Sequence, residues 1–407
     1  IVSRDDGVLF RQSPDPSGAG SLPSDDAVER LAALGYLTGY QKPTTEAGVR
    51  TYSEPDVSNG YNLYTSGHAP VAVLMDLEGK VLHEWRYDPR REPSLTEVRT
   101  RKTRRGLKYI RTVHLYPSGD LLALFDWGGI VKLDKASQKL WFHAGAFHHD
   151  IDVQSDGTIY TLDESKAEAP ALGRGTRIRD NSVVVLNAEG QVRRAVSLWS
   201  CFQNTYPASR IQELLKHDGA DVFHANSVDV IERDLSRYHP ALKKGRVLVS
   251  MRTPSLLLVV DLEAQKVSLV LEGSWKHQHD AHLQDDGRIF FFDNEGEPQA
   301  SRILELAPPR WDIAWSYSGD PPTSFYSKLQ GTVQRLPNGN TLITESARGR
   351  VVEVDRRKKI VWEFVSPHRD TDDQELMAVL LDVQRIDKGF PIEWRAERSP
   401  RGNATQR

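Results

Sequence analysis

Three histidines and one arginine occupy equivalent places in a repeated part of the sequence. Arg111, His149 and His279 each lie eight residues before the glycine of a short turn, and His224 begins a comparable stretch, FHANSVDV. A neutral imidazole can act as a nucleophile, a general acid or a general base. A guanidinium can hold two anionic oxygens at once. These residue types suit nucleophilic catalysis on an anionic group, if the fold brings them together.

The same three histidines could instead form a metal site, because neutral imidazole is a common ligand of transition metals. An arginine beside them would repel the cation. A buried histidine elsewhere usually only satisfies a polar contact in the core. We expect this structural role for His148, His277 and His282.

A recurring segment indicates the fold that would position these residues. An apolar strand, a turn and a second strand ending near a tryptophan occur six times. The tryptophans of the copies are Trp85, Trp141, Trp199, Trp275, Trp315 and Trp362. Successive turns are 45 to 74 residues apart, which is typical of propeller blades with inserted loops.

Hairpins with glycine turns precede most of the copies, for example HDIDVQSDGTIYTL and TVQRLPNGNTLITE. Their alternation of apolar and polar residues is typical of strands. Four strands in each of six copies predict an all-β protein, a six-bladed β-propeller. A long β-sandwich is the alternative, but it would not need six equivalent hairpins ending in tryptophan.

The first copy lacks an inner strand of its own, and the C-terminus offers one. DVQRIDKG (residues 382–389) aligns with TVQRLPNG (residues 332–339). Completing one blade from both termini removes an exposed edge, so we expect this segment to pair with the strand near Gly60. The inner strands of such a ring begin at the channel with Leu381, Arg111, His149, His224, His279 and Gly331.

Three regions are expected: an extension (1–50) with one short helix, the propeller (51–395) and a tail (396–407). Residues 13–23 are rich in Ser, Gly and Pro, as linkers are. Ser24 can cap a helix from Asp25 to Leu37. No signal-peptide pattern is present and Ile1 follows no initiator Met, so we expect a mature or trimmed form.

Composition argues against several classes of function. A net charge of −3 gives no overall attraction to nucleic acid or to an anionic membrane. No apolar run is long enough for a transmembrane segment. Cys201 is the only cysteine, so no intrachain disulfide can form. We expect the basic run Arg99–Lys108 to be a solvated loop, with steering of anionic substrates as the alternative.

Several segments resemble motifs of the bacterial arylsulfotransferases that do not use the nucleotide donor PAPS. HHDIDVQSDG, FHANSVDV, VLVSMR and QHDAHLQDDGRIFFFDN occur in the order found in that family. The likeness extends from about Gly60 to Trp394. HxNS, then SxR, then QHDA followed by DG and FDN form a specific combination, and the family's fold is a six-bladed propeller.

The resemblance implies roles for individual residues. His279 resembles the histidine that becomes transiently sulfurylated, and His149 and His224 resemble the histidines that assist it. Arg252 resembles the arginine that holds the sulfuryl oxygens. These four are the expected catalytic residues.

Two further residues are expected to bind substrate: Asn226, within the HxNS motif, and Arg111. The chain departs from the well-studied family members in being shorter, in lacking their cysteine pair, and in an insertion between His224 and Arg252. These differences affect the choice of acceptor more than the core chemistry.

The implied function is transfer of a sulfuryl group from an aryl sulfate ester to a phenolic acceptor through a sulfohistidine, without a cofactor. The resemblance places the protein in the periplasm or outside the cell, with small-molecule partners, and leaves a homo-oligomer open. No Walker-type or GxGxxG loop is found, as expected for a donor that is not a nucleotide. The alternatives are a three-histidine metalloenzyme and a propeller that only binds an anionic or aromatic ligand or a protein partner.

Overall fold

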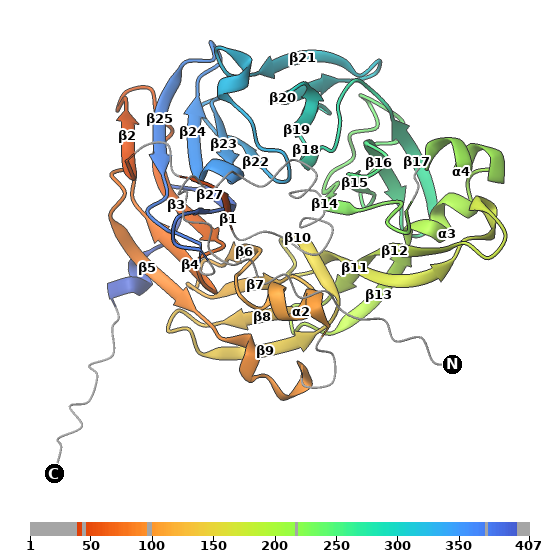
Figure 1. The fold of residues 1–407 in the computed structure, drawn as a ribbon, viewed down its shortest axis with the longest axis horizontal. Helices are drawn as coiled ribbons and strands as arrows, with labels where there is room; N and C mark the ends of the chain where they lie inside the picture. The colour runs from red at the N-terminus through yellow and green to blue at the C-terminus, as the bar shows by residue number, and fades with distance from the viewer. Residues whose placement is uncertain (1–38, 43–45, 96–99, 216–218, 371–372, 397–407) are drawn as a thin grey trace, which may run out of the picture.

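The computed structural model describes residues 39–42, 46–95, 100–215, 219–370 and 373–396. Six antiparallel sheets surround a central channel (Figure 1). This confirms the all-β, six-bladed propeller that the repeats predict. The helix expected from Asp25 to Leu37 lies outside the described residues.

Each of blades 1 to 3 has four strands, ordered from the channel outward. Blade 1 contains β27 (Leu380–Asp387), β3 (Gly60–Ser66), β4 (Val71–Met75) and β5 (Val81–Arg86). Blade 2 contains β6 (Thr112–Leu115), β7 (Leu121–Phe125), β8 (Gly129–Leu133) and β9 (Lys139–Ala144). Blade 3 contains β10 (Phe147–Val153), β11 (Ile159–Glu168), β12 (Arg177–Leu186) and β13 (Val192–Ser197).

Blades 4 to 6 complete the ring. Blade 4 contains β14 (Ala225–Val230), β15 (Val247–Met251), β16 (Leu256–Asp261) and β17 (Lys266–Leu271). Blade 5 contains β18 (His279–Leu283), β19 (Ile289–Glu297), β20 (Ala300–Ala307) and β21 (Asp312–Tyr317). Blade 6 contains β22 (Thr332–Arg335), β23 (Thr341–Glu345), β24 (Arg350–Val354), β25 (Ile360–Val365) and β2 (Gly48–Tyr52).

The ring closes as predicted from the DVQRIDKG segment. β27 is the innermost strand of blade 1 and pairs antiparallel with β3, with Val383 opposite Tyr64. The last segment of the propeller therefore completes the first blade, so that β3 has no open edge at the channel.

One strand lies within the expected extension of residues 1–50, and a second begins there and crosses its boundary. β2 adds a fifth, outermost strand to blade 6 by pairing with β25. β1 (Gly39–Gln41) pairs with the short strand β26 (Met377–Ala378), which precedes β27. The chain before the first blade therefore pairs with the propeller at two places: with β25 of blade 6 and with β26, which precedes the closing strand.

Three short helices interrupt the strands of the described chain: α2 (Arg101–Gly106), α3 (Leu198–Gln203) and α4 (Ala208–Leu214). Single 3₁₀ turns are η1 (Pro89–Arg91), η2 (Pro93–Leu95), η3 (Pro170–Leu172), η4 (Pro322–Ser324), η5 (Ser346–Arg348) and η6 (Glu393–Ala396). α3 and α4 connect blade 3 to blade 4 at the outer edge (Figure 1).

The expectation of a solvated loop over Arg99–Lys108 is wrong for its central part, which is helix α2. The Thr100 side chain caps the first turn. Lys102 is half-buried and forms an ion pair with Glu164 of blade 3, with 2.7 Å between Nζ and Oε1. The helix therefore packs against blade 3 of the propeller and is not a solvated loop.

The recurring tryptophans link neighbouring blades. An indole N–H donates to a turn carbonyl of the next blade in three cases: Trp85 to Gly119, Trp141 to Ala188 and Trp362 to Leu77. Trp199 differs, because Ser197 caps α3 and places this tryptophan in the helix instead of at the end of a strand.

Apolar side chains fill the wedges between blades. In β3, Leu63 packs into the cluster shared with blade 2, and its neighbour Tyr64 packs into the cluster shared with blade 6. Successive side chains point to opposite faces of a strand, so both faces of the blade are covered. This explains why β3 is buried along its whole length.

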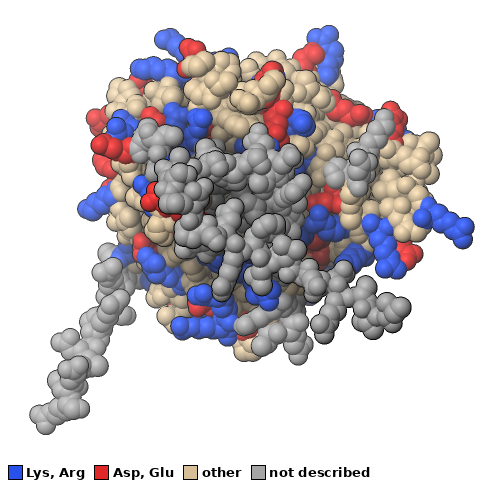
Figure 2. All heavy atoms as spheres, viewed as in Figure 1, with Lys and Arg blue, Asp and Glu red and all other residues tan. Residues whose placement is uncertain are grey.

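Carboxylates facing the channel join the inner strands to each other. Asp150 of β10 accepts a hydrogen bond from the Val228 main chain in β14, at 2.9 Å. Asp229 of β14 accepts one from the Leu283 main chain in β18, at 2.6 Å. Acidic and basic side chains are interspersed around the visible rim of the face in Figure 2, in keeping with a net charge of only −3.

Candidate active site

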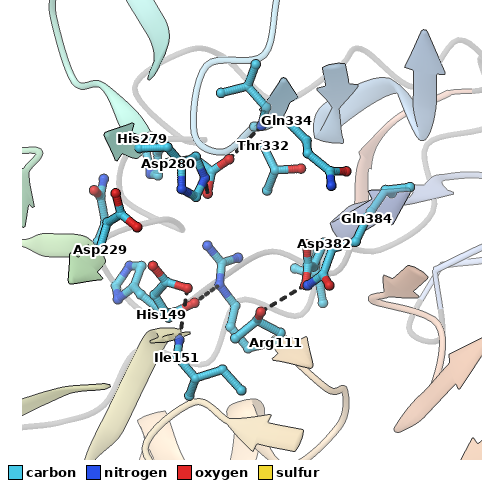
Figure 3. A pocket seen from close by; sticks show the side chains of 18 of the residues that line it. Arg111, His149, Ile151, Asp229, His279, Asp280, Thr332, Gln334, Asp382 and Gln384 are labelled. Atoms are coloured by element: carbon cyan, nitrogen blue, oxygen red, sulfur yellow. Dashed lines mark hydrogen bonds and ion pairs between the residues drawn. The ribbon is translucent and has the colours of Figure 1, made fainter. Parts of the chain in front are cut away.

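A cavity of about 390 Å³ occupies the central channel, with lining residues from all six blades (Figure 3). Its size falls in the range of pockets for small ligands. Four predicted site residues line it: Arg111, His149, Asn226 and His279. Five of the six equivalent positions that the sequence aligned thus meet at one place in the ring, whereas His224 is not among the lining residues.

An irregular backbone precedes or begins three of the inner strands. His149 and His224 have φ angles of 67° and 46°, and Asp280, next to His279, has a φ of 55°. Pairing with the second strand shifts between His148 and Ile151, between Ala225 and Ser227, and between His279 and His282. Bulges of this kind redirect side chains and often occur beside active sites.

His279 is held through one ring nitrogen. Its Nδ1 lies 2.8 Å from Asn294 Oδ1 and 3.0 Å from the His277 carbonyl oxygen. The Asn294 amide nitrogen donates to the carbonyls of Ser327 and Gln330, so its oxygen faces the histidine. His279 Nε2 is buried and has no hydrogen-bond partner among the described residues.

His149 contacts a second histidine instead of an amide. Its Nδ1 lies 2.6 Å from Nδ1 of His148. His148 Nε2 lies 3.3 Å from the Asn181 amide nitrogen, and Asn181 Oδ1 accepts a hydrogen bond from the Ala225 main chain at 2.9 Å. His148 therefore belongs to the site's surroundings and is more than a core polar residue.

His224 lies beside His149, with 5.3 Å between the ring centroids. Its Nδ1 is 2.7 Å from Asp221 Oδ2, and Arg179 binds the same oxygen at 2.8 Å. Burial alone would raise the pKa of Asp221, but His224 and Arg179 outweigh it and lower that pKa below its usual value. Asp221 is therefore ionised and can stabilise a protonated His224.

Each of the two arginines is hydrogen-bonded to the main chain of one histidine. The Arg252 main chain donates to the His224 carbonyl at 3.0 Å. Arg111 is buried and its Nε donates to the His149 carbonyl at 3.4 Å. Arg252 does not line the cavity, but its charge adds to the burial that holds the pKa of His279 well below 6.5.

Asn226 lies on β14 between the histidines of blades 4 and 5. Its amide nitrogen donates to the Gln278 carbonyl at 2.8 Å, next to His279. Its Oδ1 is buried without a hydrogen-bond partner among the described residues. Asn226 therefore brings an unused acceptor to the lining of the cavity.

His277 and His282 each pair with a carboxylate, and His282 also lines the cavity. His277 Nδ1 lies 2.5 Å from Glu295 Oε2. His282 Nε2 lies 3.2 Å from Asp280 Oδ1. Burial would lower the pKa of His282, but Asp280 and its acidic neighbours raise it to about 10.

Sequence reasoning missed three residues that touch the histidines: Asp221, Asn181 and Asn294. Asn294 ends the FDN motif and Asp221 lies three residues before His224. Their positions in or near the motifs were therefore a weak indication that they belong to the site. Asn181 left none, because it reaches the site across the blade from the third strand, β12.

Within the described ranges, no group of three or more His, Cys, Asp or Glu side chains is arranged to hold a metal ion. None of the described helices is long and apolar enough to cross a membrane.

Comparison with solved structures shows the propeller fold. A protein of unknown function from Bacteroides caccae is 11% identical with a TM-score of 0.51, and the match covers 79% of this chain and 98% of that one. Virginiamycin B lyase from Staphylococcus aureus is 10% identical with a TM-score of 0.43, covering 82% of this chain and 88% of the lyase. The second likeness is too low to support an inference.

Sequence comparison is more informative. No curated protein matches significantly, but the arylsulfotransferase (ASST) family matches residues 111–367. That span covers more than half of the chain and includes every candidate site residue, from Arg111 to His279. The chain therefore belongs to the arylsulfotransferase family.

Proposed function

We propose that the protein transfers a sulfuryl group from an aryl sulfate ester to a phenolic acceptor, with His279 as the transient carrier. Family membership supports sulfuryl transfer in general. The observation that favours His279 is the state of its ring: Nδ1 faces two oxygens that accept hydrogen bonds, and the buried Nε2 is left with its lone pair. A lone pair facing a ligand cavity is what a nucleophile requires.

In the first half-reaction, His279 Nε2 attacks the sulfur of the donor. The N–S bond forms, the bond between sulfur and the aryl oxygen breaks, and the aryl oxygen keeps the electron pair. By analogy with phosphoryl transfer, the transition state is loose and places charge on three equatorial oxygens. Arg252 and Arg111 both lower the pKa of His279 through their charge, and we assign to them the stabilisation of those oxygens.

His224 is suited to the accompanying proton transfers. Paired with the ionised Asp221, it can give a proton to the departing aryl oxygen and later take one from the acceptor phenol. In the second half-reaction the phenol oxygen attacks sulfur, the N–S bond breaks, and its electron pair returns to His279. No external oxidant or cofactor is needed.

The cavity fits substrates of this class. About 390 Å³ can hold one aromatic ring with its sulfate group. The Asn226 oxygen is available for a hydroxyl donor of the substrate. We extend the proposal to action in the periplasm or outside the cell, as for the bacterial enzymes that the motifs resemble.

Turnover of a chromogenic aryl sulfate with a phenol acceptor tests the activity, and mass spectrometry tests the intermediate. Protein incubated with donor alone should carry an adduct of about 80 Da, the mass of SO₃, on the peptide containing His279. An adduct on another residue would refute the assignment. Activity that is lost on chelation, with no adduct, would support the metalloenzyme alternative.

A further inference from the structure

His149 and His279 occupy equivalent places in blades 3 and 5, yet their ring nitrogens have different kinds of partners. His279 Nδ1 faces only oxygens. His149 Nδ1 faces the nitrogen of another imidazole. The hydrogen-bonding capacity of these partners decides which nitrogen of each ring carries the proton.

At His279 the proton must be on Nδ1. The carbonyl oxygen of His277 can only accept a hydrogen bond. Asn294 also presents its oxygen, because its amide nitrogen is used by the carbonyls of Ser327 and Gln330, at 2.6 and 3.0 Å. Nε2 of His279 therefore has no proton.

At His149 a chain of hydrogen bonds gives the opposite result. The Ala225 N–H requires an acceptor, so Asn181 presents its oxygen there and its amide nitrogen to His148 Nε2. His148 Nε2 then accepts, and its proton is on Nδ1. That Nδ1–H donates to His149 Nδ1, which leaves the His149 proton on Nε2.

Both tautomers require neutral rings, each with a single proton. Burial, then the charge of His224, lowers the pKa of His148 to about 3. Burial holds the pKa of His149 and of His279 well below 6.5, with further lowering by His224 and Arg252 respectively. Hydrogen bonding to the Asp163 main chain raises the pKa of His148 and offsets only part of this lowering.

We propose that Asn294, and Asn181 acting through His148, are positioning residues that hold the two rings in opposite tautomers. His279 then presents a lone pair at Nε2, and His149 presents an N–H at Nε2. Both rings line one cavity (Figure 3). The catalytic meaning of this arrangement rests on the proposed sulfuryl transfer, whereas the tautomers themselves do not.

Sequence motifs alone do not distinguish the roles of His149 and His279. Opposite tautomers would give the two histidines different roles. His149 cannot attack sulfur, because its cavity-facing nitrogen has no lone pair. A neutral imidazole N–H can donate a hydrogen bond to the departing aryl oxygen, but giving up that proton would leave an imidazolate. The proton transfers therefore belong to His224, which Asp221 supports.

The tautomers can be measured without substrate. Protein with ¹⁵N-labelled histidine is studied by NMR near pH 7, and the signals are assigned with the variants His149→Gln and His279→Gln. We expect a protonated Nε2 in His149 and an unprotonated Nε2 in His279. The same tautomer in both rings, or the reverse pair, would overturn the proposal even if the enzyme turns over aryl sulfates.

A variant tests the chain of hydrogen bonds. Asn181→Leu frees His148 to change tautomer, so His149 should become a mixture while His279 stays unchanged. Asn187→Leu, in the turn that follows the same strand, should alter neither ring. An unchanged His149 in folded Asn181→Leu protein would exclude Asn181 as a positioning residue. If this variant fails to fold, the wild-type spectrum still decides the tautomers.

A kinetic measurement separates positioning from general damage. Asn181→Leu should lower kcat more than it raises KM, because a hydrogen bond to the leaving oxygen is strongest in the transition state. The adduct from donor alone should still form on His279. If the wild-type protein forms no adduct at all, the proposed function fails, but the spectrum still tests the tautomers.

Discussion

At the scale of single residues, the site depends on unequal partners around similar side chains. His149, His224 and His279 are all buried or half-buried next to the same channel. An amide holds the first through His148, a carboxylate holds the second, and an amide with a carbonyl holds the third. The hydrogen-bond partner, and not the histidine itself, determines whether each ring donates a hydrogen bond, transfers a proton or presents a lone pair.

Because the three histidines have different roles, we expect their substitutions to reduce turnover to different extents. His279→Ala should remove turnover almost completely, because His149 has its proton on Nε2 and His224 serves as the acid for the departing aryl oxygen. His149→Gln and His224→Ala should keep a trace, since losing acid–base or hydrogen-bond assistance costs about 10²–10⁴-fold. Initial rates with an aryl sulfate and a phenol measure this. His239→Ala, in the inserted loop of blade 4, is the control, and equal losses in all four variants would contradict the grading.

Replacing Arg252 by lysine tests the need for a planar donor. Arg252→Lys keeps the positive charge but loses the guanidinium fork that can hold two sulfuryl oxygens. We expect kcat/KM to fall by about 10²–10³-fold, the usual cost of removing a fixed donor to a developing anion. Arg233→Lys, on the surface of the same blade, should have no effect. Wild-type kinetics in Arg252→Lys would show that the arginine acts only through its charge.

At the scale of elements, the pairing of the closing strand β27 contributes to the stability of the whole propeller. Gly60 begins β3 where it meets the end of β27. A Cβ at Gly60 would lie 2.2 Å from the Ile386 carbonyl oxygen, which no side-chain rotation can relieve. The pairing of the first and last segments of the propeller therefore requires glycine at this position.

Gly60→Ala should therefore destabilise the whole propeller by about 1–3 kcal/mol, the usual cost of a forced backbone shift. Urea unfolding followed by tryptophan fluorescence would measure it. Gly389→Ala, just beyond the end of β27, meets only the Asp387 side chain at 3.1 Å and should have a small effect. Equal midpoints for both variants would mean that closure does not limit stability.

At the scale of the whole molecule, carboxylates that face the channel affect stability as a function of pH. Burial, then the charge of Asp229, raises the pKa of Asp152 to about 7 from its usual 3.8. The folded state therefore binds this proton more tightly than the unfolded state does. Its contribution to stability is present in full below about pH 4 and is lost as the pH rises to about 7.

Asp152→Asn should remove this loss while keeping the hydrogen bond from the Val230 main chain. Relative to wild type, the variant should gain on the order of 4 kcal/mol between about pH 4 and pH 8, since the rise from 3.8 to about 7 is about three pKa units and one unit corresponds to about 1.4 kcal/mol. Unfolding midpoints across that range provide the measurement. Asp156→Asn is the control of opposite sign, because backbone hydrogen bonding lowers the pKa of Asp156. A gain for Asp152→Asn that does not vary with pH would contradict the titration.

The architecture and the location of the site could be predicted from the amino-acid sequence. Apolar periodicity and glycine turns repeat locally, so six blades, the closing segment from Asp382 to Gly389, and the shared register of Arg111, His149 and His279 could all be read from the chain. Radial symmetry then placed those residues in one ring without knowledge of any contact.

What each histidine can do depends on contacts that exist only in the folded protein. Asn181 and Ala225 are 44 residues apart, and Asn294 reaches His279 from the second strand of its blade. Such contacts leave no periodic signal, because they depend on side-chain directions at bulges with positive φ. The same holds for Trp199, where a serine cap turned an expected strand end into helix α3. Pattern determines which residues share a ring, whereas the direction of each donor and acceptor exists only once the blades are packed.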